Sequence, residues 1–137
     1  MQRPLPVADE QSAPFWEAAA RHVLVLARCS RCGLLTHPPD MVCPHCRSTS
    51  PNFVFGPAAS GGGAVRAWTV IRQSFLPGFA VPFVLVDVEL DEQADLRLIG
   101  RLLDGEEPGL RLGARVQVAF EDLEPGTAVP AFALVAS

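Results

Sequence analysis

Apolar and polar residues alternate along the second half of the chain, a pattern typical of strands with one buried face. The clearest run is 83–91, where valines and a leucine at even positions alternate with Asp and Glu at odd positions. Similar runs lie at 65–73, 96–103, 115–121 and 131–135, separated by Pro-Gly turns. Five short strands predict a small closed barrel of the OB-fold type. A sandwich fragment is the alternative, but it would leave more edges exposed.

The first part of the chain has a different pattern. Apolar side chains recur near helical spacing at Phe15, Trp16, Ala19 and Val23. Ser12 as a cap and Pro14 in the first turn suit a helix start, so we predict a helix over 14–22. Phe15 and Trp16 either anchor this helix on the core or form an arm that docks on a partner. Short strands are expected at 23–27 and 53–55.

All four cysteines lie between these two short strands, as Cys29-Ser-Arg-Cys32 and Cys43-Pro-His-Cys46. A Cys-x-x-Cys pair forms a tight turn whose amides point at the sulfur atoms. Two such turns facing each other supply four thiolates in the tetrahedral arrangement that suits zinc. The sequence therefore predicts a rubredoxin-like zinc ribbon that holds Zn²⁺ on Cys29, Cys32, Cys43 and Cys46.

Disulfides and iron are the alternatives for these cysteines. The paired spacing disfavours disulfides, and the short loop without a redox-partner motif disfavours iron. Four thiolates leave no open coordination position, so we expect the metal to support folding rather than catalysis. His37 and His45 lie nearby, and we expect His45 to face solvent rather than bind the metal.

The net charge of the chain and its distribution argue against binding to nucleic acids and other polyanions. The chain has 137 residues, a formal net charge of −4 and no lysine. Residues 1–60 hold five Arg and four acidic residues, whereas 61–137 hold six Arg and eleven acidic residues, so the predicted barrel is a poor polyanion binder. No apolar run approaches the ~18 residues that span a bilayer, and no signal peptide is present, which predicts a cytoplasmic protein.

Catalytic motifs are missing from the sequence. There is no Gly-x-Ser-x-Gly, phosphate loop, dinucleotide fingerprint or His-Glu-x-x-His. The carboxylates of 87–92 largely alternate on one strand, which indicates a solvated outer face. We therefore expect that the chain is not an enzyme by itself.

The segments divide the chain into modules. The run 56–63 is small, flexible and uncharged, which is typical of a boundary. We predict a mainly β protein with an N-terminal arm and helix (1–22), a zinc ribbon (23–56), a linker (57–63) and a five-stranded OB-fold (64–137).

This order of parts resembles a family that joins an N-terminal helix, a four-cysteine zinc ribbon and an OB-fold. That family was long catalogued as a domain of unknown function, and its members are often labelled acyl-CoA-associated or nucleic-acid-binding. The matching segments follow the family's order: 15–19, 26–29, 32–33, 38–39, 43–46, 65–70, 82–83, 88–92, 98–101, 113, 116 and 130–132.

The resemblance implies a non-catalytic accessory subunit of a thiolase-fold acyl-CoA enzyme. Such enzymes are thiolases, lipid-transfer-protein-like aldolases of steroid side chains, and acyltransferases. The subunit would stabilise its enzyme and help to shape the acyl-CoA channel. A hotdog-fold enoyl-CoA hydratase is a further partner that the family implies, and the dimeric thiolase fold implies a hetero-oligomer with two copies of each chain. The family's metal ligands fall on the four cysteines.

Several residues of the predicted barrel are candidates for this contact. Phe75, Phe79 and Phe83 surround one loop, which indicates a surface buried by a partner or an acyl chain, or a plug at the barrel end. Arg66 and Arg72 on the adjoining strand are candidates for CoA phosphates, and Trp68 lies between them.

The alternative function is a binding module for single-stranded nucleic acid. OB-folds and zinc ribbons both serve this purpose, with Trp68, Phe75 and Phe79 available for base stacking. The acidic barrel half disfavours it, because phosphate binding requires a positive groove.

Overall fold

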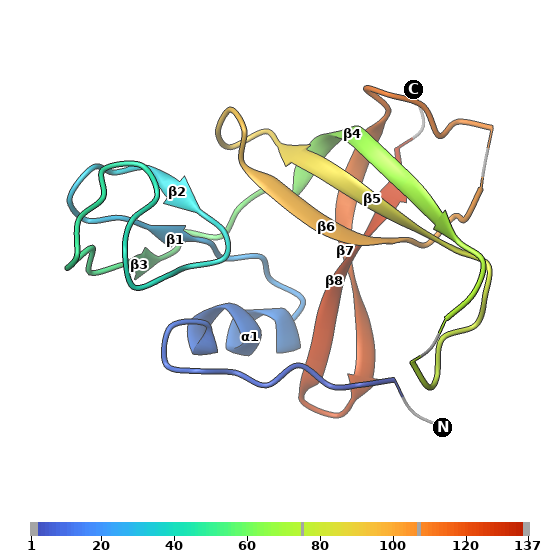
Figure 1. Ribbon diagram of the computed structural model, residues 1–137, viewed down its shortest axis with the longest axis horizontal. Coiled ribbons are helices and arrows are strands. Elements are labelled where there is room, and N and C mark those ends of the chain that lie inside the picture. Colours follow the sequence, from blue (N-terminus) through green and yellow to red (C-terminus); the bar gives the residue numbers. More distant parts are fainter. Residues whose placement is uncertain (1–2, 75, 107, 136–137) are drawn as a thin grey trace.

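The computed structural model describes residues 3–74, 76–106 and 108–135 (Figure 1). One helix, α1 (Ala13–Ala20), comes first. Three two-residue strands follow: β1 (Ala27–Arg28), β2 (Leu35–Thr36) and β3 (Val54–Phe55). The remaining five strands are longer: β4 (Gly62–Ile71), β5 (Phe83–Leu90), β6 (Arg97–Leu102), β7 (Arg115–Glu124) and β8 (Thr127–Leu134).

The five long strands form a closed barrel in the order β4-β5-β6-β8-β7. All neighbouring pairs are antiparallel except β6 and β8, which are parallel. The short strands form a separate small sheet in the order β2-β1-β3. The predicted fold class, a helix and a four-cysteine ribbon followed by a five-stranded OB-fold barrel, is thus confirmed.

The strand pattern arises from the barrel interior. In β5 every second side chain is buried, as the alternation in the sequence predicts. The fully buried side chains of the interior come from all five strands and include Val65, Val86, Val88, Leu102, Val116 and Phe132. Phe132 of β8 is 0% exposed and is the largest fully buried side chain of this core.

Two barrel strands begin earlier than the sequence suggested. β4 starts at Gly62 because its backbone lies very close to β5: a Cβ on Gly63 would meet the Glu89 carbonyl oxygen at 2.6 Å. β8 starts at Thr127 and contains Pro130, which pairs with Phe120. The N–H of Val118 donates to the carbonyl of Gly61 rather than to β8. Because every second N–H of a strand points the same way, the N–H of Phe120 also points away from β8. Proline is tolerated opposite such a position.

Two local predictions about the N-terminal part are wrong. Residues 23–26 form no strand, because their alternating burial comes from an extended segment whose Leu24 and Leu26 pack into the core. Ser12 does not cap α1 through its side chain. Instead Asp9 and Ser12 bond reciprocally, since the Asp9 carboxylate accepts the Ser12 N–H at 2.7 Å and the Ser12 hydroxyl accepts the Asp9 N–H at 3.1 Å.

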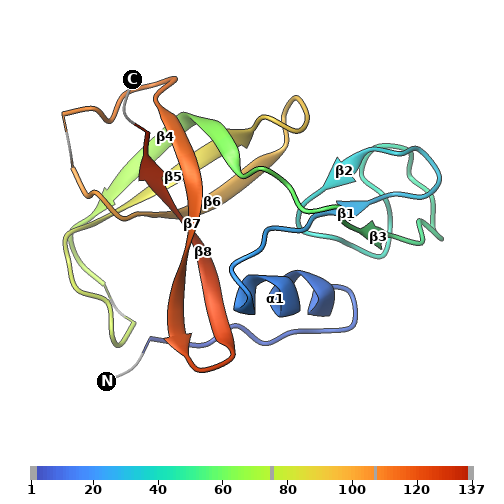
Figure 2. The ribbon, with the colours of Figure 1, turned by 180° about the vertical axis from the view of Figure 1, so that it is seen from behind.

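Helix α1 lies beside the long β7–β8 hairpin, between the barrel and the ribbon (Figures 1 and 2). It ends at Ala20, and His22, just after the C-cap residue Arg21, has a positive φ of 60°, the left-handed conformation common after a helix. The His22 ring stacks on Phe120 at 5.5 Å, and its Nε2 lies 2.8 Å from the Asp122 carboxylate. The helix is therefore fixed to the barrel at its C-terminal end.

Within the described residues, no helix is long and apolar enough to cross a membrane.

Candidate functional site

The four cysteines lie on two turns with the same backbone geometry. The carbonyls of Cys29 and Cys43 accept the N–H of Gly33 and Arg47, each four residues later. Gly33 and Arg47 both have positive φ, at 78° and 62°. The N–H of Cys29 and that of Cys43 are in turn bonded to the carbonyls of Leu34 and Ser48. The two Cys-x-x-Cys segments are therefore equivalent turns, as the spacing predicts.

The sulfur positions fit a tetrahedral metal site. The Sγ atoms of Cys29 and Cys46, and those of Cys32 and Cys43, are 3.8 Å apart, and all four lie within 4.8 Å of one another. Tetrahedral coordination with metal–sulfur bonds of ~2.3 Å requires sulfur separations of about 3.8 Å. A disulfide would need about 2.0 Å. The cluster therefore fits a structural metal held by four thiolates.

The surroundings of two of the thiols shift their pKa values in opposite directions. The amides of Cys46 and His45 outweigh desolvation and lower the pKa of the Cys43 thiol to about 6. The Leu34 amide acts in the same direction on Cys32, but burial and the neighbouring sulfur atoms outweigh it and raise the pKa of Cys32 to about 11. Of these two thiols, Cys43 is the one that loses its proton more readily to bind a cation at neutral pH.

The two nearby histidines serve the fold instead of the metal. His45 is exposed, as expected, and its Nε2 also lies 3.0 Å from the Leu35 carbonyl. His37 packs its ring on Phe15 at 4.9 Å, and burial lowers its pKa. The His37 ring therefore joins the ribbon to α1, whereas the His45 ring makes a contact within the ribbon.

The ribbon is also tied directly to the barrel. The Gln93 side chain, from the loop between β5 and β6, accepts the Leu35 N–H and donates to the Leu35 carbonyl, both at 2.8 Å. Both backbone groups of one β2 residue are thus satisfied by one side chain.

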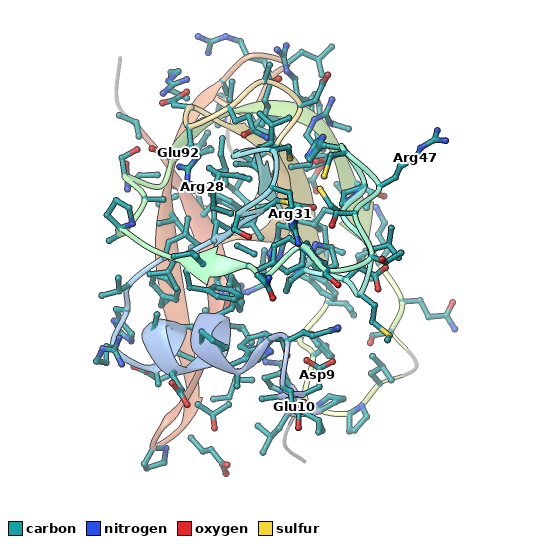
Figure 3. The ribbon with its side chains drawn as sticks, turned by 90° about the vertical axis from the view of Figure 1, so that its left-hand side faces the viewer. Asp9, Glu10, Arg28, Arg31, Arg47 and Glu92 are labelled. Atoms are coloured by element: carbon teal, nitrogen blue, oxygen red, sulfur yellow. The ribbon has the colours of Figure 1, made fainter. Side chains whose placement is uncertain are left out.

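On the outer side of the ribbon, Arg47 extends away from the cysteine cluster, as Figure 3 shows.

Of the candidate residues in this region, Arg66 and Trp68 lie on β4 and Arg72 lies just beyond it. Arg66 pairs with Glu89 at 2.5 Å, and Arg72 pairs with Glu106 at 3.3 Å. Trp68 is 41% exposed. The acidic residues of 87–92 are occupied in the same way: Asp87 pairs with Arg97, and Asp91 pairs with Arg115.

Two of the three phenylalanine candidates, Phe79 and Phe83, lie at one end of the barrel. The rings of Phe79 and Phe83 stack at 5.3 Å, and both line a hollow of about 170 Å³ on the outer face. Its other apolar walls come from β5, β7 and β8, namely Leu85, Leu123, Val129 and Pro130. We call these residues, together with Arg3, Pro4, Arg101 and Glu121, the loop-end groove. Phe75 lies outside the described residues.

An ion network forms the polar side of the loop-end groove. Arg101 binds Glu121 with two hydrogen bonds of 2.9 and 2.7 Å, and Arg3 reaches the same carboxylate at 3.3 Å. Burial raises the pKa of Glu121, but the Arg101 hydrogen bonds and the charges of both arginines outweigh it and hold the pKa below its usual range. Arg3 also lies 5.2 Å from the centre of the Phe79 ring, a cation–π contact.

Sequence reasoning missed Arg3, Arg101 and Glu121. Arg101 and Glu121 fall on the outer face of predicted strands, but no local pattern shows that they meet across the barrel. Arg3 belongs to an arm whose course depends on the tertiary structure. The contact between Arg3 and Glu121 joins residues 118 positions apart.

The structure separates the roles of Phe15 and Trp16. Phe15 is 4% exposed and belongs to the buried core, so this side chain anchors the helix. Trp16 packs on that core and meets the Phe15 ring edge-on at 4.9 Å. It also lines a hollow of about 230 Å³ between the N-terminal arm and the β7–β8 turn.

The fold and the cysteine cluster together define a protein of the zinc-ribbon plus OB-fold class. Residues 16–52 match the family described as "ChsH2, rubredoxin-like zinc ribbon domain", and residues 57–121 match "ChsH2, C-terminal OB-fold domain". The chain therefore belongs to the ChsH2 family, also called DUF35, as its resemblance to a zinc-ribbon and OB-fold family predicted.

Individual relatives agree with this assignment. A solved chain of an Ltp2-ChsH2(DUF35) aldolase is 32% identical with a TM-score of 0.80, and the match covers 96% of this chain and 99% of that one. A probable enoyl-CoA hydratase alpha subunit of Thermomonospora curvata is 33% identical over 95% of this chain and 39% of its own length. The 3-oxo-4,17-pregnadiene-20-carboxyl-CoA hydratase alpha subunit of Mycobacterium tuberculosis is 31% identical over 85% of this chain and 36% of its own.

A DUF35 domain-containing scaffold protein of Methanocaldococcus jannaschii is 27% identical over 76% of this chain and 72% of its own length. The chain thus spans about two fifths of the length of the two hydratase subunits and most of the scaffold protein.

Proposed function

We propose that this chain is a non-catalytic accessory subunit of an acyl-CoA enzyme, and that it stabilises that enzyme. The partner is a thiolase-fold or lipid-transfer-protein-like enzyme, with a hotdog-fold enoyl-CoA hydratase as a further candidate. The similarity over nearly the whole of a chain from an Ltp2-ChsH2(DUF35) aldolase supports this proposal most strongly. The names of the hydratase subunits and of the scaffold protein point in the same direction.

The metal in this proposal is Zn²⁺, and its role is structural. Four thiolates bind it, so they fill a tetrahedral coordination sphere and leave no position for substrate. When bound, the ion supplies folding energy to the ribbon. Zinc suits four thiolates because it is stable in tetrahedral sulfur sites and has no redox chemistry.

The surface that faces the partner lies at the loop end of the barrel. Leu76 and Val81 of the loop between β4 and β5 are exposed, and Phe79 of the same loop stacks on Phe83. A cluster of exposed apolar side chains on an acidic protein is typical of a surface that another molecule covers. We propose that this end also borders the acyl-CoA channel of the complex.

Binding of single-stranded nucleic acid is less well supported. The arginines on the barrel strands, at positions 66, 97, 101 and 115, all pair with carboxylates, and so does Arg72 just beyond β4. These arginines are therefore interspersed with carboxylates and do not form the extended positive groove that phosphate binding requires.

The test is an affinity purification of the tagged chain from its native cells, followed by mass spectrometry and light scattering. We expect one acyl-CoA enzyme in stoichiometric amount, in a cytoplasmic complex with two copies of each chain. Purification of the chain alone as a monomer would contradict the proposal. A heparin column at low salt, on which we expect no retention, tests nucleic-acid binding separately.

A further inference from the structure

We propose that the loop-end groove receives one large apolar side chain of the partner enzyme, and that a carboxylate beside this side chain binds Arg101. This inference rests on the proposed function, because it requires a partner. It adds the chemistry of the partner segment: an apolar residue next to Asp or Glu on an exposed surface.

The size of the groove selects a side chain over a cofactor. The hollow is about 170 Å³. A cavity of about 150 Å³ lined by apolar side chains binds benzene, whereas sites for small molecules and cofactors usually span ~300–1,000 Å³. The groove therefore has room for a phenylalanine or leucine side chain but not for a CoA thioester. Pockets that take one aromatic or aliphatic anchor carry much of the energy of protein interfaces.

The charge of the groove selects an acidic neighbour for that anchor. The second half of the chain is strongly acidic, yet the groove contains two arginines and one carboxylate, and its local charge is positive. Arg101 uses Nε and Nη2 on Glu121. Among the described residues, its Nη1 makes no hydrogen bond, so this end of the guanidinium has donors to offer an incoming carboxylate.

The groove is already ordered before a partner binds. Phe79 is held between the Phe83 ring and the Arg3 guanidinium. Glu121 is held by Arg101 and Arg3. Few side chains must therefore lose freedom on binding, which lowers the entropic cost of association. The N-terminal arm runs past the β7–β8 hairpin toward this loop (Figures 1 and 2). Because its Arg3 holds Phe79 and Glu121 in place, the arm is part of the binding surface.

The first experiment measures the affinity of variants for the co-purified enzyme. We expect Phe79→Ala and Arg101→Gln each to weaken binding at least tenfold in biolayer interferometry. The matched control is Arg115→Gln, because Arg115 also forms an ion pair on the outer face of the barrel but lies six residues from Glu121 along β7, roughly 20 Å away. Circular dichroism and zinc content establish that each variant is folded. Wild-type affinity of both groove variants would overturn the proposal.

The second experiment uses the chain alone and does not depend on the partner. We expect 3-phenylpropionate, which joins a phenyl ring to a carboxylate, to shift the NMR signals of Leu85 and Val129 with millimolar affinity. Arg101→Gln should weaken this binding severalfold, and Arg115→Gln should not. A mixture of toluene and acetate is the control, because it supplies the ring and the carboxylate as separate molecules. No shift at the groove would overturn the proposal, whereas failure to capture any enzyme would overturn the proposed function and leave this result to stand.

Discussion

The ribbon and the barrel are stabilised in different ways. The barrel has five strands of six to ten residues around a core of fully buried side chains. The ribbon has three strands of two residues each, and its two equivalent turns bring four sulfur atoms together. The alternation of apolar and polar side chains specifies the barrel, whereas metal binding by the four cysteines specifies the ribbon. The ribbon should therefore depend on the ion, and the barrel on its core.

The largest effect should come from removing one metal ligand. Structural zinc in small domains contributes apparent free energies of ~10–16 kcal/mol at pH 7. We expect Cys43→Ser to lose the metal, measured by inductively coupled plasma mass spectrometry, and to lose amide protection at residues 27–55 in hydrogen exchange. The barrel amides should stay protected. Thr49→Ser, in the same loop but without a ligand, is the control. Loss of protection throughout the barrel would show that the two modules do not differ as described.

The next largest effect should come from the barrel core. Phe132 is fully buried, and truncation of a buried phenylalanine costs about 3–5 kcal/mol. We expect Phe132→Ala to lower the free energy of unfolding by this amount in urea titrations and to keep its metal in the folded state. Val135→Ala, an exposed position just after β8, should change stability by less than ~0.5 kcal/mol. Metal loss from folded Phe132→Ala would contradict the separation of the modules.

The two modules also differ in how far their structure follows from the sequence. The β5 pattern predicts its strand because one face packs inside the barrel. The cysteine spacing predicts the metal cluster because each turn is local. The pattern of residues 23–26 predicts a strand that does not form, because alternating apolar residues indicate alternating burial but not pairing with another strand. The loop-end groove could not be predicted, because Arg3, Arg101 and Glu121 meet only after the barrel closes.

A smaller effect should come from the ion network of the loop-end groove. Glu121→Gln weakens the charge-assisted bonds to Arg101 and Arg3, and we expect a loss of about 1–2 kcal/mol at pH 7. The folded-state pKa of Glu121 lies below the ordinary value, so its contribution is present above about pH 4.3 and is lost as the pH falls through the lowered value.

Urea midpoints of wild type and Glu121→Gln should therefore differ by a constant amount above about pH 4.3 and converge as the pH falls below it. Both proteins contain the same thiols, so their difference removes the pH effect of the metal site. Glu124→Gln, an exposed carboxyl at the end of β7, is the control and should follow the wild type at every pH. A gap that stays constant from about pH 4.3 into the acid range would exclude titration of Glu121 as the cause.

The smallest effect should come from the second cysteine turn. Arg47 occupies a position with φ of 62° at which the equivalent turn has Gly33. The left-handed conformation costs a non-glycine residue about 1 kcal/mol. We expect Arg47→Gly to stabilise the ribbon by about 0.5–1 kcal/mol, measured as slower metal release to a chelator. Faster release than that of the wild type would show that the Arg47 side chain is needed.

Gln93 gives the boundary between the modules a further property. Its amide bonds both backbone groups of Leu35 as a neighbouring strand would, so a single residue of the barrel completes the open side of the ribbon sheet. Unpaired sheet edges are templates for self-association. A ribbon expressed without the barrel would expose that edge, and we expect it to aggregate even when loaded with metal. The attachment of the barrel to the ribbon thus prevents self-association through the edge of the ribbon sheet.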